Sequence, residues 1–454
     1  MSYLLLTLLL LPLVGSGLVF AWRNTSSKYL ALGIALIQML LTFYVVSDFD
    51  FNPTVDSVLQ YEINYPWSQF IKSNLHFGID GMSLLLLLLT NILMPIIILS
   101  SFNENVSYKN SFYGLILLMQ FGLVGVFTAL DGLLFYIFWE VTLIPIWFIA
   151  ALWGQENKRL EFTTKFFVYT FVGSLFMLAG LIYVYTHSAS FALTDLYNAD
   201  LGETQQIVVF WFIFFAFAVK LPVFPFHTWQ PDTYTYSPTQ GSMLLSGIML
   251  KMAIYGVLRY LLPITPTAIF GISGQIVIIL AIVGIVHGAL IAIIQTDMKR
   301  IIAYSSFSHV GLMVAGIFSS AVLTLRGTFT IEGAEGALVQ TFAHGINVAG
   351  LFFCAETFNA ITVARSITNN LFIYKLMILP RISAASTFLY LFEIVVFTSQ
   401  LSLVVTSSIS SVTSVACFCF VAVVVNLKFC LAGNIFTPTF VKLEYFQLSV
   451  DMPC

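Results

Sequence analysis

Long apolar runs recur along most of the chain and are separated by short polar connections. Each run approaches the roughly 20 residues that a helix needs to cross a bilayer. Because the runs are continuous, and do not alternate between apolar and polar residues as barrel strands do, they predict α-helices. The predicted spans are 3–21, 29–47, 82–100, 112–130, 132–153, 166–186, 207–226, 240–262, 270–294, 301–323 and 336–356.

Two or three further spans are expected between residues 371 and 433, which gives about 13 to 14 helices for the whole chain. Composition agrees, since 59% of the residues are hydrophobic and only 9% are charged, whereas about a quarter are charged in a soluble domain. The sequence therefore predicts an all-α polytopic membrane protein. A formal net charge of −3 gives no reason to expect a nucleic-acid partner.

Basic residues are concentrated in alternate connections, which predicts the orientation of the chain in the membrane. The connection at 187–206, "HSASFALTDLYNADLGETQQ", has three acidic residues and no Lys or Arg. By the positive-inside rule, the basic connections face the cytoplasm and the N-terminus lies outside. Three basic residues violate this arrangement, namely Lys72, Arg259 and Arg326. The residues that follow it are Arg23, Lys28, Lys109, Lys158, Arg159, Lys165, Lys299 and Arg300.

Three ionisable residues lie inside predicted spans: Glu140, Lys220 and Lys251. A charge at membrane depth costs a few kcal/mol on insertion scales, so such a residue indicates function unless its side chain can reach the interface. Lys251 lies about eleven positions from either end of its predicted span, which is too deep for its ammonium group to reach water. All three residues are therefore candidates for a proton relay.

Lys220 is followed at once by two prolines, Pro222 and Pro225. Proline removes backbone donors, and interrupted helices in membranes occur where the loosened backbone lines a hydrated cavity. Lys220 is thus expected to face internal water, with Glu140 as its nearest carboxylate. Burial weakens the hold of a lysine on its proton and a nearby carboxylate strengthens it, so a contact that opens and closes would switch the proton affinity. The direction of pumping stays open.

Two histidines lie in apolar surroundings, His309 after a group of serines in "SSFSHV" and His344 in "FAHGINV". Histidine titrates near neutral pH and suits a relay, but a histidine that only joins two helices by a hydrogen bond would look the same. His287 is a weaker candidate of the same kind. No cluster of residues has metal-ligand spacing. The five cysteines show no cluster-binding spacing, so the chain is expected to carry no redox centre of its own.

Four segments resemble the antiporter-like subunits of the proton-pumping NADH:quinone oxidoreductase, respiratory complex I. The second and third resemble most closely the subunits called chain M, or chain 4 in mitochondria. The resemblance covers about Met1 to Glu356. The segments are "FGIDGMSLLLLLLT" (Phe77–Thr90), "FWEVTLIPIWFIAALWG" (Phe138–Gly154), "VKLPVFPFHTWQPD" (Val219–Asp232) and "TDMKRIIAYSSFSHVG" (Thr296–Gly311).

The resemblance implies fourteen helices with two inverted five-helix repeats. It divides the chain into N-terminal helices at 1–110, a first repeat at 111–262, and a second repeat at 263–454 that diverges after about residue 356. Four candidate residues match positions of the family: Glu140 its fifth-helix glutamate, Lys220 the lysine of its broken seventh helix, Lys251 its eighth-helix lysine that passes protons laterally, and His309 part of its central polar axis.

The implied function is proton translocation driven by quinone reduction in neighbouring subunits, in the inner membrane of a bacterium or of a mitochondrion if the gene is organellar. The partners are other membrane subunits, lipid and protons. NADH, FMN, iron–sulfur clusters and quinone belong to other subunits, and no cofactor or metal is expected in this chain. Two alternatives remain: a subunit of a multisubunit Na⁺/H⁺ antiporter, or an inactive membrane scaffold.

The sequence departs from the family pattern in two places. Tyr236 stands where the family often has a glutamate. After Glu356 the family motifs end, and only one of the 28 glycines, Gly433, lies in this tail. The second repeat should contain a proton-exit residue, for which Glu393 is the candidate because it is the only charged residue between Arg381 and Lys428. The tail is either divergent or translated in a shifted frame.

Overall fold

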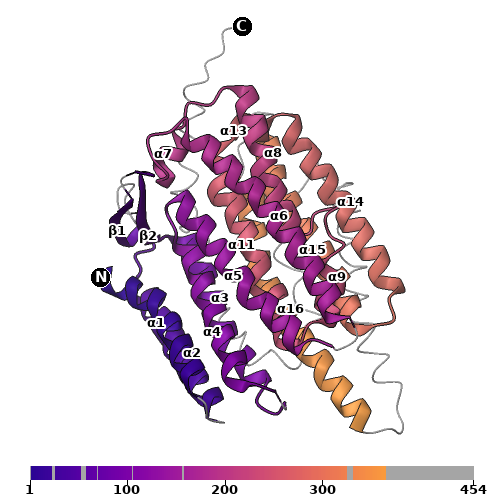
Figure 1. Cartoon of the computed structure of the whole chain (residues 1–454). Helices are drawn as coiled ribbons and strands as arrows, with labels where there is room; N and C mark the ends of the chain where they lie inside the picture. The colour runs from indigo at the N-terminus through magenta and orange to yellow at the C-terminus, as the bar shows by residue number, and fades with distance from the viewer. Residues whose placement is uncertain are drawn as a thin grey trace.

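The computed structural model describes residues 2–22, 26–52, 58–68, 70–104, 106–155, 158–324 and 331–364. Eleven helices within these residues are long and apolar enough to cross a membrane (Figure 1). Ten of them are α1 (Ser2–Ala21), α2 (Ser27–Asp48), α3 (Gly81–Ser100), α4 (Lys109–Thr128), α5 (Gly132–Trp153), α6 (Arg159–Tyr185), α8 (Glu203–Lys220), α14 (Ile272–Ile294), α15 (Met298–Thr324) and α16 (Glu332–Ala364).

The eleventh, which we call the central helix, runs from Thr239 to Ile264. Two of its turns are π-helical, with one more residue per hydrogen-bonded ring than an α-helix. The 18-residue window that defines this span is entirely buried. Along the chain it consists of α10 (Thr239–Leu244), the π-turn η2 (Leu245–Met249), α11 (Leu250–Gly256), the π-turn η3 (Val257–Leu261) and α12 (Leu262–Ile264).

The prediction of a polytopic helical membrane protein is confirmed, and each of the eleven spans predicted before residue 357 corresponds to one of these helices. The span predicted at 207–226 was too long, because α8 already ends at Lys220, just before the two prolines. The spans expected between residues 371 and 433, together with Glu393, lie outside the described residues.

The sequence analysis missed a β-hairpin in the connection between α2 and α3. Strands β1 (Gln60–Ser68) and β2 (Ser73–Ile79) pair antiparallel. The hairpin lies against the ends of α4 and α5, where the Leu130 backbone N–H donates to the His76 carbonyl at 2.9 Å. The shorter helices are α7 (Leu193–Tyr197), α9 (Gln230–Tyr236) and α13 (Pro266–Phe270).

The helices alternate in direction, so their connections gather at two ends of the bundle. We call them the hairpin end, which holds the β-hairpin and α7, and the basic end, which holds the Lys- and Arg-rich connections (Figure 1). Contacts tie the basic connections together: Lys28 Nζ donates to the Phe102 carbonyl at 3.2 Å, and Arg300 Nη2 to Asp232 Oδ1 at 3.1 Å. This arrangement is the one that the charge pattern predicts.

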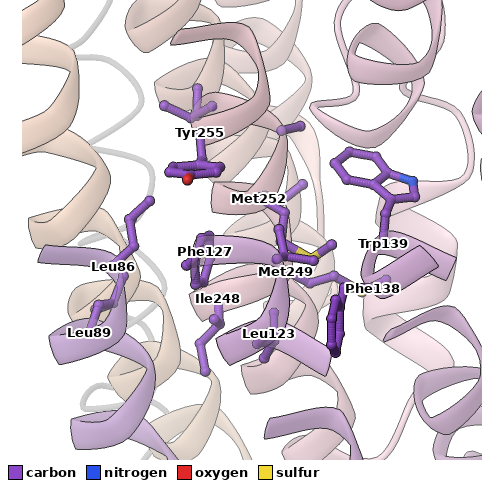
Figure 2. Close-up of a cluster of buried hydrophobic side chains, with 14 of the residues drawn as sticks. Leu86, Leu89, Leu123, Phe127, Phe138, Trp139, Ile248, Met249, Met252 and Tyr255 are labelled. Atoms are coloured by element: carbon purple, nitrogen blue, oxygen red, sulfur yellow. The ribbon is translucent and has the colours of Figure 1, made fainter. Parts of the chain in front are cut away.

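Hydrophobic side chains of α3, α4, α5 and the central helix form the core, part of which Figure 2 shows. Helices α1, α2, α6 and α14 surround it and leave many large apolar side chains exposed, as lipid contact requires. The labelled core residues are Leu86, Leu89, Leu123, Phe127, Phe138, Trp139, Ile248, Met249, Met252 and Tyr255.

Buried amides connect the N-terminal helices. Asn91 of α3 donates from Nδ2 to Thr42 Oγ1 of α2 at 2.7 Å, and Gln120 Nε2 of α4 donates to Asn91 Oδ1 at 2.8 Å. Gln38 Nε2 of α2 donates to the Leu8 carbonyl of α1 at 2.6 Å. Because lipid provides little hydrophobic drive for helices to associate, such hydrogen bonds help to fix their positions.

Candidate functional site

The interruption after α8 places Lys220 at the end of a helix inside the bundle. Pro222 has no backbone N–H, and the Val223 N–H takes its place by donating to the Ala218 carbonyl at 2.8 Å. The Val219 carbonyl then accepts from the indole Nε1 of Trp229 at 2.8 Å. These two carbonyls are thus paired, and helical structure resumes at α9.

Lys220 is 2% exposed, and its ammonium lies 5.2 Å from the centre of the Trp139 ring on α5. Glu140, the next residue on α5, is close enough to interact with it electrostatically. The two side chains nevertheless form no ion pair, and the Lys220 ammonium makes no hydrogen bond, within the part of the chain that the structure describes. Lys220 is therefore a buried cation attracted by Glu140 without direct contact.

Glu140 lies midway along α5 and faces α6, where the Ser174 side chain interacts with its carboxyl group. The Oε1 atom of Glu140 is buried and has no hydrogen-bond partner among the described residues. A carboxylate oxygen in this position normally binds water or a proton donor. The Oε1 atom of Glu140 can therefore accept a further hydrogen bond close to Lys220.

Lys251 is held in a different way. It is 1% exposed and follows the π-turn η2 of the central helix. Its ammonium donates to the Ser246 carbonyl at 2.5 Å and contacts His344 Nδ1 at 2.9 Å. Because π-turns displace carbonyls from regular α-helical pairing, they recur at functional sites in helices.

His344 on α16 connects Lys251 to His309 on α15, whose ring centre lies 5.8 Å from that of His344. The Lys251 ammonium can only donate, so His344 Nδ1 accepts and its proton lies on Nε2. His309 Nδ1 lies 2.8 Å from the Ser305 carbonyl and must donate to it, which leaves its Nε2 as an acceptor. The two rings thus present a donor and an acceptor of complementary type.

Further polar atoms are buried without a partner among the described residues, on the same side of the central helix. They include both amide atoms of Gln230 and the hydroxyl of Tyr234 on α9, Ser306 Oγ on α15 and His344 Nε2. Helix α9 packs against α6, α10 and α15, which places it between the surroundings of the two lysines. Buried polar groups without a protein partner are usually bound by ordered water. We interpret these atoms as positions for bound water between the two lysines, and call them the hydratable route.

The structure therefore brings five of the predicted residues into two groups, Glu140 with Lys220 and Lys251 with His344 and His309. Glu393 lies outside the described residues. The weaker candidate His287 faces His227, with ring centres 5.0 Å apart, in the segment after the interruption.

Sequence reasoning missed a buried ion pair between Arg259 of the central helix and Asp80, at the hairpin end. Two signals of this pair are present in the sequence. Asp80 lies within the segment Phe77–Thr90 that resembles the family, and Arg259 is an exception to the orientation rule. The pairing explains the exception, because a buried and neutralised arginine does not count among loop charges. Of the other two exceptions, Lys72 lies in the hairpin turn and Arg326 outside the described residues.

Comparisons with known proteins agree with this architecture. The family described as "NADH:quinone oxidoreductase/Mrp antiporter, TM" matches residues 129–427, and so extends beyond Glu356. NADH-quinone oxidoreductase subunit M of Rickettsia conorii is 37% identical over 359 residues, which cover 76% of this chain and 70% of that protein. F(420)H(2) dehydrogenase subunit M of Methanosarcina mazei is 38% identical, over 77% of this chain and 70% of that protein.

Among solved structures, respiratory complex I from Thermus thermophilus with bound NADH contains a chain with a similar fold. The TM-score is 0.69 at 30% sequence identity. The match covers 78% of this chain and 71% of that chain.

Proposed function

The chain belongs to the NADH:quinone oxidoreductase/Mrp antiporter family of transmembrane subunits, and on this basis we propose that it is a proton-translocating membrane subunit of an NADH:quinone oxidoreductase. It would lie in the inner membrane of a bacterium or a mitochondrion, beside other membrane subunits of the complex. The observation that carries the proposal is Lys220, a buried ammonium that forms no hydrogen bond with any described residue and lies near Glu140 at the end of an interrupted helix.

The proposed mechanism begins with the distance between these two side chains. When Glu140 approaches, its negative charge stabilises the ammonium, and Lys220 holds its proton. When Glu140 moves away, the buried ammonium loses this support and releases its proton to the hydratable route along α9. Quinone reduction in a neighbouring subunit would move the charge that draws Glu140 away.

Lys251 would first pass its own proton to His344 Nδ1 and would then be reprotonated by the proton that Lys220 releases. Its ammonium already contacts His344 Nδ1, and His344 Nε2 and His309 Nε2 are of opposite hydrogen-bonding type. One proton entering at Lys251 can therefore be exchanged along Lys251, His344 and His309 without a large movement of any helix. The protein supplies fixed distances and a low dielectric, and the chemistry consists of proton transfer alone.

We assign the redox groups to partner subunits. The cysteines of this chain lack the spacing that ligates iron–sulfur clusters, which supports this assignment. The relationship to an F(420)H(2) dehydrogenase subunit also supports it, because that complex uses another electron donor with a similar membrane chain. The choice of donor would then lie outside this subunit.

The decisive experiment replaces Lys220 by Ala in the whole complex, reconstituted in vesicles with NADH and quinone. Coupled proton pumping should be abolished, because no other side chain at that position can hold the proton. Lys158→Ala is the matched control, since Lys158 is an exposed lysine at the basic end of the same bundle. Unchanged pumping by the assembled Lys220→Ala complex would remove the proposed role.

The same vesicles separate the alternatives. An antiporter subunit, which the family also includes, would show Na⁺-dependent proton movement in the absence of NADH and quinone. A passive scaffold would tolerate Lys220→Ala and lose only assembly when its packing is disturbed. The buried position of Lys220 argues against a scaffold, because a charge at membrane depth is costly to retain without a use.

A further inference from the structure

The central helix has polar side chains at regular spacing towards the hairpin end. Lys251, Tyr255 and Arg259 are four residues apart, and therefore lie on one face of the helix. Lys251 and Arg259 are separated by about 12 Å along the axis at 1.5 Å per residue. A row of this kind could conduct a proton from Lys251 to the hairpin end, or could prevent it from doing so.

On the side towards the basic end, Lys251 meets groups that can carry a proton. Its ammonium donates to the Ser246 backbone carbonyl, one turn nearer the basic end, and contacts His344, which can accept a proton. Unpartnered buried atoms follow, such as Ser306 Oγ and His344 Nε2. The hydratable side of Lys251 thus faces α15 and α16, away from Arg259.

On the side towards the hairpin end, the polar side chains are hydrogen-bonded to one another. Arg259 donates from Nη2 to Asp80 and to Ser83 Oγ, the latter at 3.3 Å, and its Nε donates to the Tyr255 hydroxyl at 3.3 Å. The Arg259 carbonyl accepts from the Tyr197 hydroxyl of α7 at 2.6 Å. Among the described residues, none of these side chains has a buried polar atom without a partner.

Aromatic rings fill the space around this ion pair. Tyr255 packs edge-on against Phe127 with ring centres 5.6 Å apart, and Tyr260 stacks on Phe135 at 4.2 Å. Figure 2 shows Tyr255 and Phe127 side by side in the core. Rings packed at these distances leave no room for water between them.

We propose that Arg259, held in place by Asp80, is the positioning residue that closes the route from Lys251 to the hairpin end, so that a proton on Lys251 can leave only towards His344. An arginine serves this purpose because guanidinium is permanently protonated and has no lone pair with which to accept a proton. The carboxylate of Asp80 compensates the charge of Arg259 and offsets the cost of burying the guanidinium. This inference rests on the proposed function, since it concerns protons carried by Lys251.

The test measures passive proton leak in vesicles that contain the whole complex without NADH, after an imposed pH gradient. Arg259→Gln keeps hydrogen-bond donors but removes the cation. The gradient should decay several-fold faster than with the unaltered complex. The double variant Arg259→Gln with Lys251→Ala should return the leak to its original rate, because the opened route leads through Lys251.

Asp131→Asn is the matched control. Asp131 is also a buried aspartate at the hairpin end that caps a helix, accepting from the Leu133 and Leu134 N–H groups at 3.0 Å, but it has no arginine partner. It should leave the leak unchanged. If Arg259→Gln does not assemble, Asp80→Asn gives the same test, since Asn is as good a helix cap as Asp and only the charge that anchors Arg259 is removed.

The proposal is overturned if the assembled Arg259→Gln or Asp80→Asn complex holds a gradient as well as the unaltered one, or if the leak survives Lys251→Ala. The readout is independent of the proposed function. Normal NADH-driven pumping by Lys220→Ala would contradict the proposed function. An unchanged passive leak in Arg259→Gln would contradict only the closure of the route by Arg259.

Discussion

The two buried lysines lie in opposite kinds of surroundings. Lys220 stands at the end of a broken helix, above the Trp139 ring, and is attracted by a carboxylate that it does not touch. Lys251 lies in the middle of a continuous helix, and its ammonium contacts two groups within 3 Å. Both lysines are almost fully buried.

This difference suggests a division of labour. A charge without fixed partners responds strongly to a small movement of its counter-charge, because the interaction depends on distance in a medium of low dielectric. A charge fixed by hydrogen bonds responds little and serves better as a stable intermediate position. We therefore interpret Lys220 as the switch and Lys251 as the relay.

After Lys220→Ala, the largest expected effect comes from Glu140→Gln, which removes the counter-charge of Lys220. Loss of a buried counter-charge costs about 3–5 kcal/mol, and about 1.4 kcal/mol corresponds to a factor of ten. We expect coupled pumping to fall below about a tenth of its original rate. The measurement is NADH-driven acidification of vesicles containing the assembled complex.

Glu203→Gln, which changes an exposed glutamate in the first turn of α8, controls for the chemical change and should pump normally. Unchanged pumping by the assembled Glu140→Gln complex would contradict the switch.

Much of this molecule could be predicted from sequence because the membrane imposes simple rules. Continuous apolar runs located the eleven described spans, and Pro222 and Pro225 located the interruption. The end of α8 could not be fixed, since the apolar pattern continues past Lys220 through Val223 and Phe224. The hairpin was missed because its strands lie in a polar connection without a long apolar run.

Pairings between distant residues were beyond sequence reasoning. Lys251 contacts His344 across 93 positions, and Arg259 donates to Asp80 across 179. The packing of the helices decides which of their faces meet, and it cannot be deduced from a single sequence. Both histidines could therefore only be named as candidates. The sequence thus identifies which charged residues are buried, whereas only the structure shows which residues they contact.

A smaller effect is expected from the histidines beside Lys251. His344→Ala removes one of the two contacts of the ammonium and should reduce coupled pumping several-fold. His309→Ala leaves both contacts intact and should reduce it less, because His309 follows His344 along the route. The rates come from the same acidification measurement.

The order of these two effects is the sensitive point. His187→Ala is a control outside the spans, since His187 lies in the connection after α6 and its ring contacts the Thr186 hydroxyl, the Tyr183 carbonyl and the Gln205 amide. If His309→Ala were more damaging than His344→Ala, the route would not pass through the Lys251–His344 contact in the proposed order.

The smallest effect on pumping, with a clear effect on stability, is expected from Trp229→Phe. The substitution removes the indole donor of the buried Val219 carbonyl, and an unsatisfied buried group costs about 1–3 kcal/mol. Trp153→Phe is matched in volume, but its indole donates to the Ser107 carbonyl at the more exposed basic end, where water can replace it. Thermal unfolding of the solubilised complex should therefore shift further for Trp229→Phe. Equal shifts would mean that this hydrogen bond does not stabilise the interruption beside Lys220. The lack of fixed partners at Lys220, in contrast to Lys251, would then have another cause.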